Sequence, residues 1–141
     1  MWIPGLGFLV AATARAHANG DVDTFTVSAG GLVLVTKIWG VITVAPGGAV
    51  TVNVGNNPTL GTATTVVWWT GADVNGSGVG DVIGVDMVAG TPTTVITGRI
   101  APMNFVALAG TIFVRGTAVQ GTSQWSLCYI PLVAGSTVVT V

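Results

Sequence analysis

The sequence predicts an all-β protein: a β-sandwich or jelly-roll-like body of about ten short strands, with an extended N-terminal arm. The first observation is residues 32–45, LVLVTKIWGVITVA, where apolar and β-branched residues fill both alternating faces and only Lys37 is charged. The second is the recurrence of Gly, Pro and Asn between short apolar runs, which is typical of strands joined by turns. A strand that is apolar on both faces needs cover on both, so we expect residues 32–45 to be the central strand.

The N-terminal segment, residues 1–20, differs in composition from the rest of the chain. It begins with the apolar run MWIPGLGFLV and continues with an alanine-rich stretch. It lacks the basic residues that open a secretory signal peptide, and it is too short and too rich in glycine to span a bilayer as a helix. We therefore expect residues 1–20 to form an arm on a neighbouring subunit and residues 21–141 to form a single all-β domain. The side chains expected to anchor the arm are Trp2, Ile3, Phe8 and Leu9.

The body reads as strands separated by turn residues. We expect a turn at residues 29–31, before the central strand, and a bend, bulge or crossing between sheets at Gly40 within it. Trp68 and Trp69 end another candidate strand, and adjacent strand residues point to opposite faces, so one of the two is expected at an interface. The other candidate strands are residues 24–28, 49–54, 62–69, 82–88, 93–99, 104–108, 111–115, 123–130 and 137–141.

The charge content restricts the partners of the protein. Charged residues make up 6% of the chain, against about 25% in an average soluble domain, and the net charge is −1. So little surface charge favours a protein that is covered by copies of itself or by a larger assembly. The four cations, Arg15, Lys37, Arg99 and Arg115, are scattered, so we expect no nucleic-acid partner. No stretch offers about 20 apolar residues free of turn formers, so we expect no membrane partner either.

The inventory of reactive side chains argues against catalysis. The chain has one His, one Cys and no Glu, and His17 lies far in sequence from Cys128. Neither residue has the local sequence context of a nucleophile or a base, so we expect no enzyme and no cofactor. A single cysteine cannot form an internal disulfide, and its place in an apolar strand predicts a buried, inert thiol.

One loop has the spacing of a calcium site. In residues 73–81, DVNGSGVGD, oxygen-bearing side chains stand at positions 1, 3, 5 and 9, with glycine at position 6, as in an EF-hand loop. Position 12 is Gly84, where such loops place a bidentate acid, and the flanking residues predict strands instead of helices. We therefore interpret residues 73–81 as a Gly/Asn/Asp turn and expect no bound metal.

Two blocks of sequence carry a resemblance to a known family. Residues 52–85 contain GNNPTLGTATT and GADVNGSGVGDVIGV, and residues 121–141 read GTSQWSLCYIPLVAGSTVVTV. In these blocks the chain resembles the small Gly/Thr/Val-rich virion structural proteins of tailed bacteriophages, of the capsid decoration or cement type. The resemblance implies an all-β homo-oligomer, often a trimer, that sits on the capsid surface and braces the lattice without chemistry.

The leading hypothesis is a non-enzymatic structural protein of a bacteriophage particle, which oligomerises and braces neighbouring capsomers through contact with the major capsid protein. A tail or fibre subunit is a variant of this hypothesis. The alternative is a secreted or cell-surface β-sandwich module that binds glycan or protein, since tryptophan rings can stack on sugars. The candidate subunit and capsid interface residues are Trp2, Ile3, Phe8, Leu9, Trp68 and Trp69.

Overall fold

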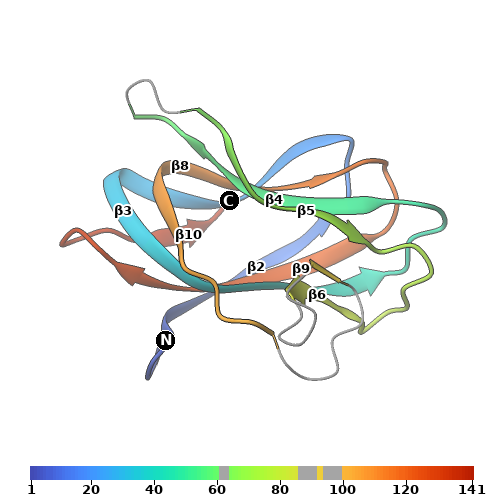
Figure 1. Cartoon of the computed structure of the whole chain (residues 1–141), viewed down its shortest axis with the longest axis horizontal. Helices are drawn as coiled ribbons and strands as arrows, with labels where there is room; N and C mark the ends of the chain where they lie inside the picture. The colour runs from blue at the N-terminus through green and yellow to red at the C-terminus, as the bar shows by residue number, and fades with distance from the viewer. Residues whose placement is uncertain (61–63, 86–91, 94–99) are drawn as a thin grey trace.

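The computed structural model describes residues 1–60, 64–85, 92–93 and 100–141, and in these residues the chain is all-β, with no helix (Figure 1). The all-β expectation is confirmed. Parts of the expected strands 62–69, 82–88 and 93–99 lie outside the described residues. Strands β1 to β10 join in a 10-stranded antiparallel sheet of order β1-β2-β9-β3-β8-β4-β5, with β10 and β6 also on β3 and β7 on β6. Their bounds are β1 Trp2–Ile3, β2 Gly7–Ala16, β3 Gly20–Val44, β4 Thr51–Pro58, β5 Val66–Asp73, β6 Val82–Val85, β7 Pro92–Thr93, β8 Phe105–Gly116, β9 Thr122–Pro131 and β10 Val138–Thr140.

Strand β3 has partner strands on both of its edges, and most of its 25 residues are paired on at least one edge. On one edge it pairs with β8 between residues 20 and 35, and then with β6 at residues 40–41. On the other edge it pairs with β10 at residues 25–27 and with β9 between residues 33 and 44. The expectation that residues 32–45 form the central strand is therefore met up to Val44, and the strand begins earlier, at Gly20.

The turn expected at residues 29–31 is a bulge within β3. Val27 pairs with Gly110 and Leu32 with Leu108, so residues 28–31 stand opposite one residue of β8. The connection between β9 and β10 stabilises this bulge, because the hydroxyl of Ser136 accepts a hydrogen bond from the Leu32 amide at 3.0 Å. Gly30, with φ of 70°, takes a backbone conformation that other residues rarely adopt. The bulge bends β3 without ending it.

The sheet folds back on itself around one apolar core. Trp69 of β5 and Trp125 of β9 come from distant places in the strand order, yet their ring centroids lie 6.1 Å apart. In Figure 1, β4 and β5 accordingly run across the view above β2 and β9. The core includes Phe25, Val35 and Ile38 of β3, all with no exposed surface. This arrangement is consistent with the expected sandwich.

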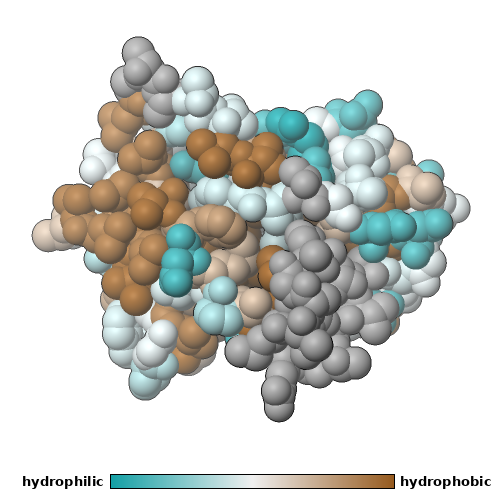
Figure 2. Space-filling model, in the orientation of Figure 1, coloured by the Kyte–Doolittle hydropathy of each residue, from teal (hydrophilic) through white to brown (hydrophobic). Residues whose placement is uncertain are grey.

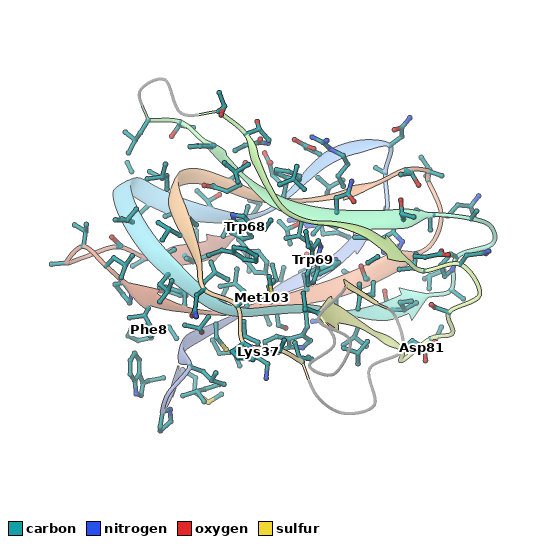
Figure 3. The ribbon with its side chains drawn as sticks, viewed as in Figure 1. Phe8, Lys37, Trp68, Trp69, Asp81 and Met103 are labelled. Carbon is teal, nitrogen blue, oxygen red and sulfur yellow. The ribbon has the colours of Figure 1, made fainter. Side chains whose placement is uncertain are left out.

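Both paired tryptophans point inward, which corrects the expectation that they face opposite sides. Val54 pairs with Trp69 and Gly55 with Val67, so Trp68 is an extra residue in a β-bulge. The ring of Trp68 stacks on Phe105 at 5.3 Å with an interplanar angle of 8°. Figure 3 shows both tryptophans between the ribbons.

The N-terminal segment is also part of the sheet, which corrects the expectation of an extended arm. Strand β2 pairs with β9 from Phe8 opposite Tyr129 to Ala16 opposite Thr122, and β1 folds back on β2 as a hairpin. Gly7 makes the close approach to β9 possible, because a Cβ there would lie 2.1 Å from the carbonyl oxygen of Tyr129. The alanine-rich sequence of β2 suggested an arm. In the structure β2 supplies hydrogen-bond partners for the backbone N–H and C=O groups along one edge of β9.

Gly40 is paired on both sides, with Trp125 of β9 and Ile83 of β6, and does not mark a bulge. A Cβ at Gly40 would lie 2.8 Å from Cε2 of the Trp125 ring, which itself has no exposed surface. We expect Gly40→Ala to lower the free energy of unfolding by roughly 1–3 kcal/mol, because the buried indole has to move. Urea denaturation of the two proteins measures the difference.

Gly78→Ala is the matched control, because the nearest atom to a Cβ there is the Asp81 carboxylate at 3.9 Å. This control should change stability by less than about 1 kcal/mol. Equal effects of the two substitutions would contradict the packing of Trp125 against Gly40.

Candidate functional site

The expected interface residues of the N-terminal segment lie together on the β1–β2 hairpin. Trp2 is 53% exposed and Phe8 39% exposed, and their rings meet edge to face with centroids 5.1 Å apart. Phe8 in turn lies 5.6 Å from the ring of Tyr129, which is buried. We call the exposed pair Trp2 and Phe8 the aromatic clip; Figure 3 shows Phe8 at the periphery of the molecule. Ile3 and Leu9 are partly buried on the same hairpin.

The hairpin is held in place by its own chain. The Thr36 hydroxyl of β3 donates a hydrogen bond to the carbonyl of Leu6, so the β1–β2 turn reaches across β9. The amide of Leu9 donates to the carbonyl of Met1 at 2.8 Å. The aromatic clip is therefore presented on an ordered support.

The other two expected interface residues are not on the surface in the same way. Trp69 is 5% exposed and lies in the core, and Trp68 is partly buried against Phe105. Figure 3 places both tryptophans in the interior of the molecule, away from Phe8 at the periphery. The structure thus brings four of the six candidates together and separates the two tryptophans from them.

A second apolar surface was not identified from the sequence. Six part-exposed apolar side chains lie on the outward face of three adjacent strands, in two rows, with Val106 52% exposed and Leu132 48% exposed. Figure 2 shows apolar side chains gathered at the end of the molecule where β3 and β8 bend. We call this surface the outer patch; its members are Leu32, Leu34, Val106, Leu108, Ile130 and Leu132. Their alternation along each segment was visible in the sequence, but the register that aligns three distant segments was not.

Charged and amide side chains occupy a different part of the surface. Asp21 of β3 forms an ion pair with Arg115 of β8 and accepts a hydrogen bond from Asn57 at 2.9 Å. The hydrogen bond from Arg115, aided by that from Asn57, lowers the pKa of Asp21. The Arg115 guanidinium also lies 5.1 Å from the centroid of the Phe113 ring. These groups satisfy one another on a partly exposed sheet face, where such pairs contribute little stability.

The structure brings the one histidine next to a serine. His17 Nδ1 lies 2.7 Å from the carbonyl oxygen of Gln120, and its Nε2 lies 2.8 Å from Ser123 Oγ. A carbonyl only accepts, so for neutral His17 the proton is on Nδ1 and the Ser123 hydroxyl donates to Nε2. A serine and histidine in this relation can form a nucleophile and base, but His17 is 1% exposed and Ser123 0%. No substrate reaches them in this conformation. Their hydrogen bonds link the connection between β2 and β3 to the start of β9.

Cys128 is internal, and Asp73 and Asp81 are already hydrogen-bonded. Burial raises the pKa of the Cys128 thiol, which is fully buried. In the loop after β5, Asp73 accepts a hydrogen bond from the Asn75 amide at 2.9 Å, and Asp81 accepts one from the Gly78 amide at 2.8 Å. Within the described ranges, no three His, Cys, Asp or Glu side chains gather as a metal site would require. The described residues also contain no helix long and apolar enough to cross a membrane.

Comparisons with protein-family models, with curated proteins and with solved structures gave no match to this chain. The description of the fold and of the surfaces therefore rests on the sequence and structure of this chain alone. Two apolar surfaces of the described residues, the aromatic clip and the outer patch, are the candidate functional sites.

Burial lowers the pKa of His17 from its ordinary value of 6.5, so stability should depend on pH near neutrality. The unfolded chain takes up a proton at His17 before the folded chain does, so the free energy of unfolding falls as the pH falls below about 7. The slope is at most about 1.4 kcal/mol per pH unit. Urea denaturation at several pH values between 7.5 and 5.5 measures it.

His17→Gln is the control, because it removes the only histidine while it keeps a side chain that can donate and accept. The pH slope in this window should disappear in the variant. The lowered pKa of Asp21 acts in a separate range, because its stabilisation is lost only as the pH falls below about 4. An unchanged slope in His17→Gln would contradict the assignment of the slope to His17.

Calcium should not bind tightly to residues 73–81, because both terminal carboxylates already cap backbone amides of the loop and position 12 is Gly84. Thermal unfolding curves recorded with chelator and with millimolar calcium should coincide. A shift of several degrees would show that the loop is a cation site and that its turn interpretation is wrong.

Proposed function

We propose that this protein is a non-enzymatic structural protein of a tailed-bacteriophage particle, a capsid decoration or cement protein. It self-associates on the capsid surface and braces neighbouring capsomers through contact with the major capsid protein. The sequence resemblance supplies the capsid setting and the expectation of a trimer. The observation that supports an assembly role is the aromatic clip, two large rings left exposed on a hairpin that is otherwise bonded to its own sheet.

The clip is well suited to anchor a subunit. Each large apolar side chain contributes on the order of 1.5–3 kcal/mol when it is fully buried. A disordered arm would lose part of this gain to the entropy of ordering, but β1 and β2 are already ordered by their pairing. Contacts repeated over many subunits of a lattice add through effective concentration, so an anchor of moderate affinity is sufficient.

The reactive groups of the described residues support a structural role. Ser123 and His17 have the geometry of a catalytic pair but no access, and Cys128 is buried with a raised pKa. Asp21 and Arg115 are already paired with each other, so neither charge is left without a partner. These observations favour binding through apolar surface over chemistry at a polar site.

The alternative function is a secreted or cell-surface β-sandwich module for glycan or protein. The exposed indole of Trp2 is the feature that would serve a glycan, since a sugar ring can stack on it. Glycan sites also use carboxylates and amides, and residues 1–12 contain neither. The intact mass of the native protein separates the two functions, because loss of residues 1–18 would indicate secretion and their retention the virion.

The double substitution Trp2→Ala and Phe8→Ala should weaken binding to capsids by at least about tenfold, because it removes both rings of the clip. The sheet should remain folded, since both side chains are partly exposed. Co-sedimentation with purified phage particles measures binding, and circular dichroism checks the fold. Val79→Ala, at a 70% exposed loop position, is the control and should bind as the original chain does.

Mass spectrometry of purified virions of the phage that encodes the chain tests whether the protein is part of the particle. Gold labelling then locates the protein on the particle. Absence of the chain from the virions would refute the proposed function. A folded Trp2/Phe8 variant that binds particles as tightly as the original chain would refute the role of the clip.

A further inference from the structure

We propose that the outer patch is the surface through which copies of this chain pack on one another, patch against patch. This inference rests on the proposed assembly function and names the contact between copies. The aromatic clip then remains for the capsid lattice. The outer patch would serve self-association, and the aromatic clip would serve attachment to the capsid.

The outer patch has a regular geometry set by strand pairing. In one row Leu34 of β3 pairs with Ile130 of β9 on one side and with Val106 of β8 on the other. In the next row Leu32 pairs with Leu108 and accepts a hydrogen bond at its carbonyl from the Leu132 amide at 2.9 Å. Two rows on three neighbouring segments therefore form one continuous apolar surface.

The patch faces outward because the alternate residues of the same segments fill the core. In β3, Val33 lies between the two patch residues and Val35 follows them, and neither has exposed surface. Ala107 of β8, which lies between two patch residues, has none either. The patch residues themselves are all part exposed or exposed. Bulky leucine, isoleucine and valine on both faces of a sheet indicate that both faces are covered in the working protein.

The chemistry of the patch favours a second copy over other partners. None of its six side chains carries a charge or a hydrogen-bonding group, so it offers nothing to a phosphate backbone or to a sugar. The outward face of the other half of β3 is polar, with Asp21 and Asp23 beside Arg115 and Thr111. The patch of another copy offers an apolar surface of the same extent, so a second copy is the occupant that we assign to it. A net charge of −1 opposes that contact only weakly.

The position of the patch suits a closed oligomer. It lies at one end of the molecule, over the bend of β3 and β8, so several copies can meet there around one symmetry axis (Figures 1 and 2). Its first row also continues onto the hairpin, because the Ile130 side chain lies against Gly7, which pairs with Ile3. The contact can thus extend over five neighbouring strands, roughly 19 Å at the usual strand spacing.

The test places a charge in the patch at its two most exposed positions, Val106→Lys with Leu132→Lys. The matched control is Val44→Lys with Val119→Lys, at positions that are 54% and 73% exposed and outside the patch. Sedimentation velocity over a range of concentrations at fixed salt measures self-association, and circular dichroism with thermal melting checks that each variant is folded. Both variants carry the same added charge, so a difference between them reports the position of the charge.

We expect the original chain and the control to associate, and the patch variant to need at least about tenfold higher concentration for the same degree of association. An original chain that stays monomeric, or a folded patch variant that associates as the control does, would overturn the inference. Binding to particles is measured separately, by co-sedimentation. A chain that associates through the patch but is absent from virions refutes the proposed function alone, and a chain that binds particles without patch contacts refutes this inference alone.

Discussion

The structure depends on the pairing of β3 along both of its edges. A strand of 25 residues carries β8 and β6 on one side and β9 and β10 on the other, so four of its neighbours are positioned by one segment. Because the apolar residues of β3 alternate on two faces, the same strand supplies the core with Phe25, Val35 and Ile38 and the surface with Leu32 and Leu34. The outer patch is therefore a direct consequence of the strand on which the fold is built.

The sequence was sufficient for the features that depend on local pattern. The all-β class, the central strand and the turn-rich loop at residues 73–81 follow from alternation and from turn residues. Features set by distant partners were not visible. Gly30 and Gly31 suggest a turn in the sequence. In the structure they are part of a bulge, because the flanking residues Leu32 and Ser28 form hydrogen bonds with Ser136 and Thr137, more than 100 residues away. The bulge at Trp68 likewise depends on the register of β4 and β5.

The candidate site was predictable to a similar extent. Trp2, Ile3, Phe8 and Leu9 were identified because they are large and apolar in a short N-terminal stretch, and they do lie together on one hairpin. Their support was misjudged, since the partner of β2 is β9, over 100 residues along the chain. The outer patch and the pair of His17 with Ser123 were missed because each joins segments that only the sheet register brings together.

The central claim is that the outer patch and the aromatic clip are both covered when the protein assembles on a particle. Hydroxyl-radical footprinting of the protein, free at high dilution and assembled on particles, tests this claim most directly because it reports side-chain exposure residue by residue. The account predicts that labelling of Leu34, Leu132 and Trp2 falls on assembly, while Val79 and Val119, exposed at 70% and 73% elsewhere, stay labelled. Unchanged labelling of Leu34, Leu132 and Trp2, or protection confined to Val79 and Val119, would contradict it.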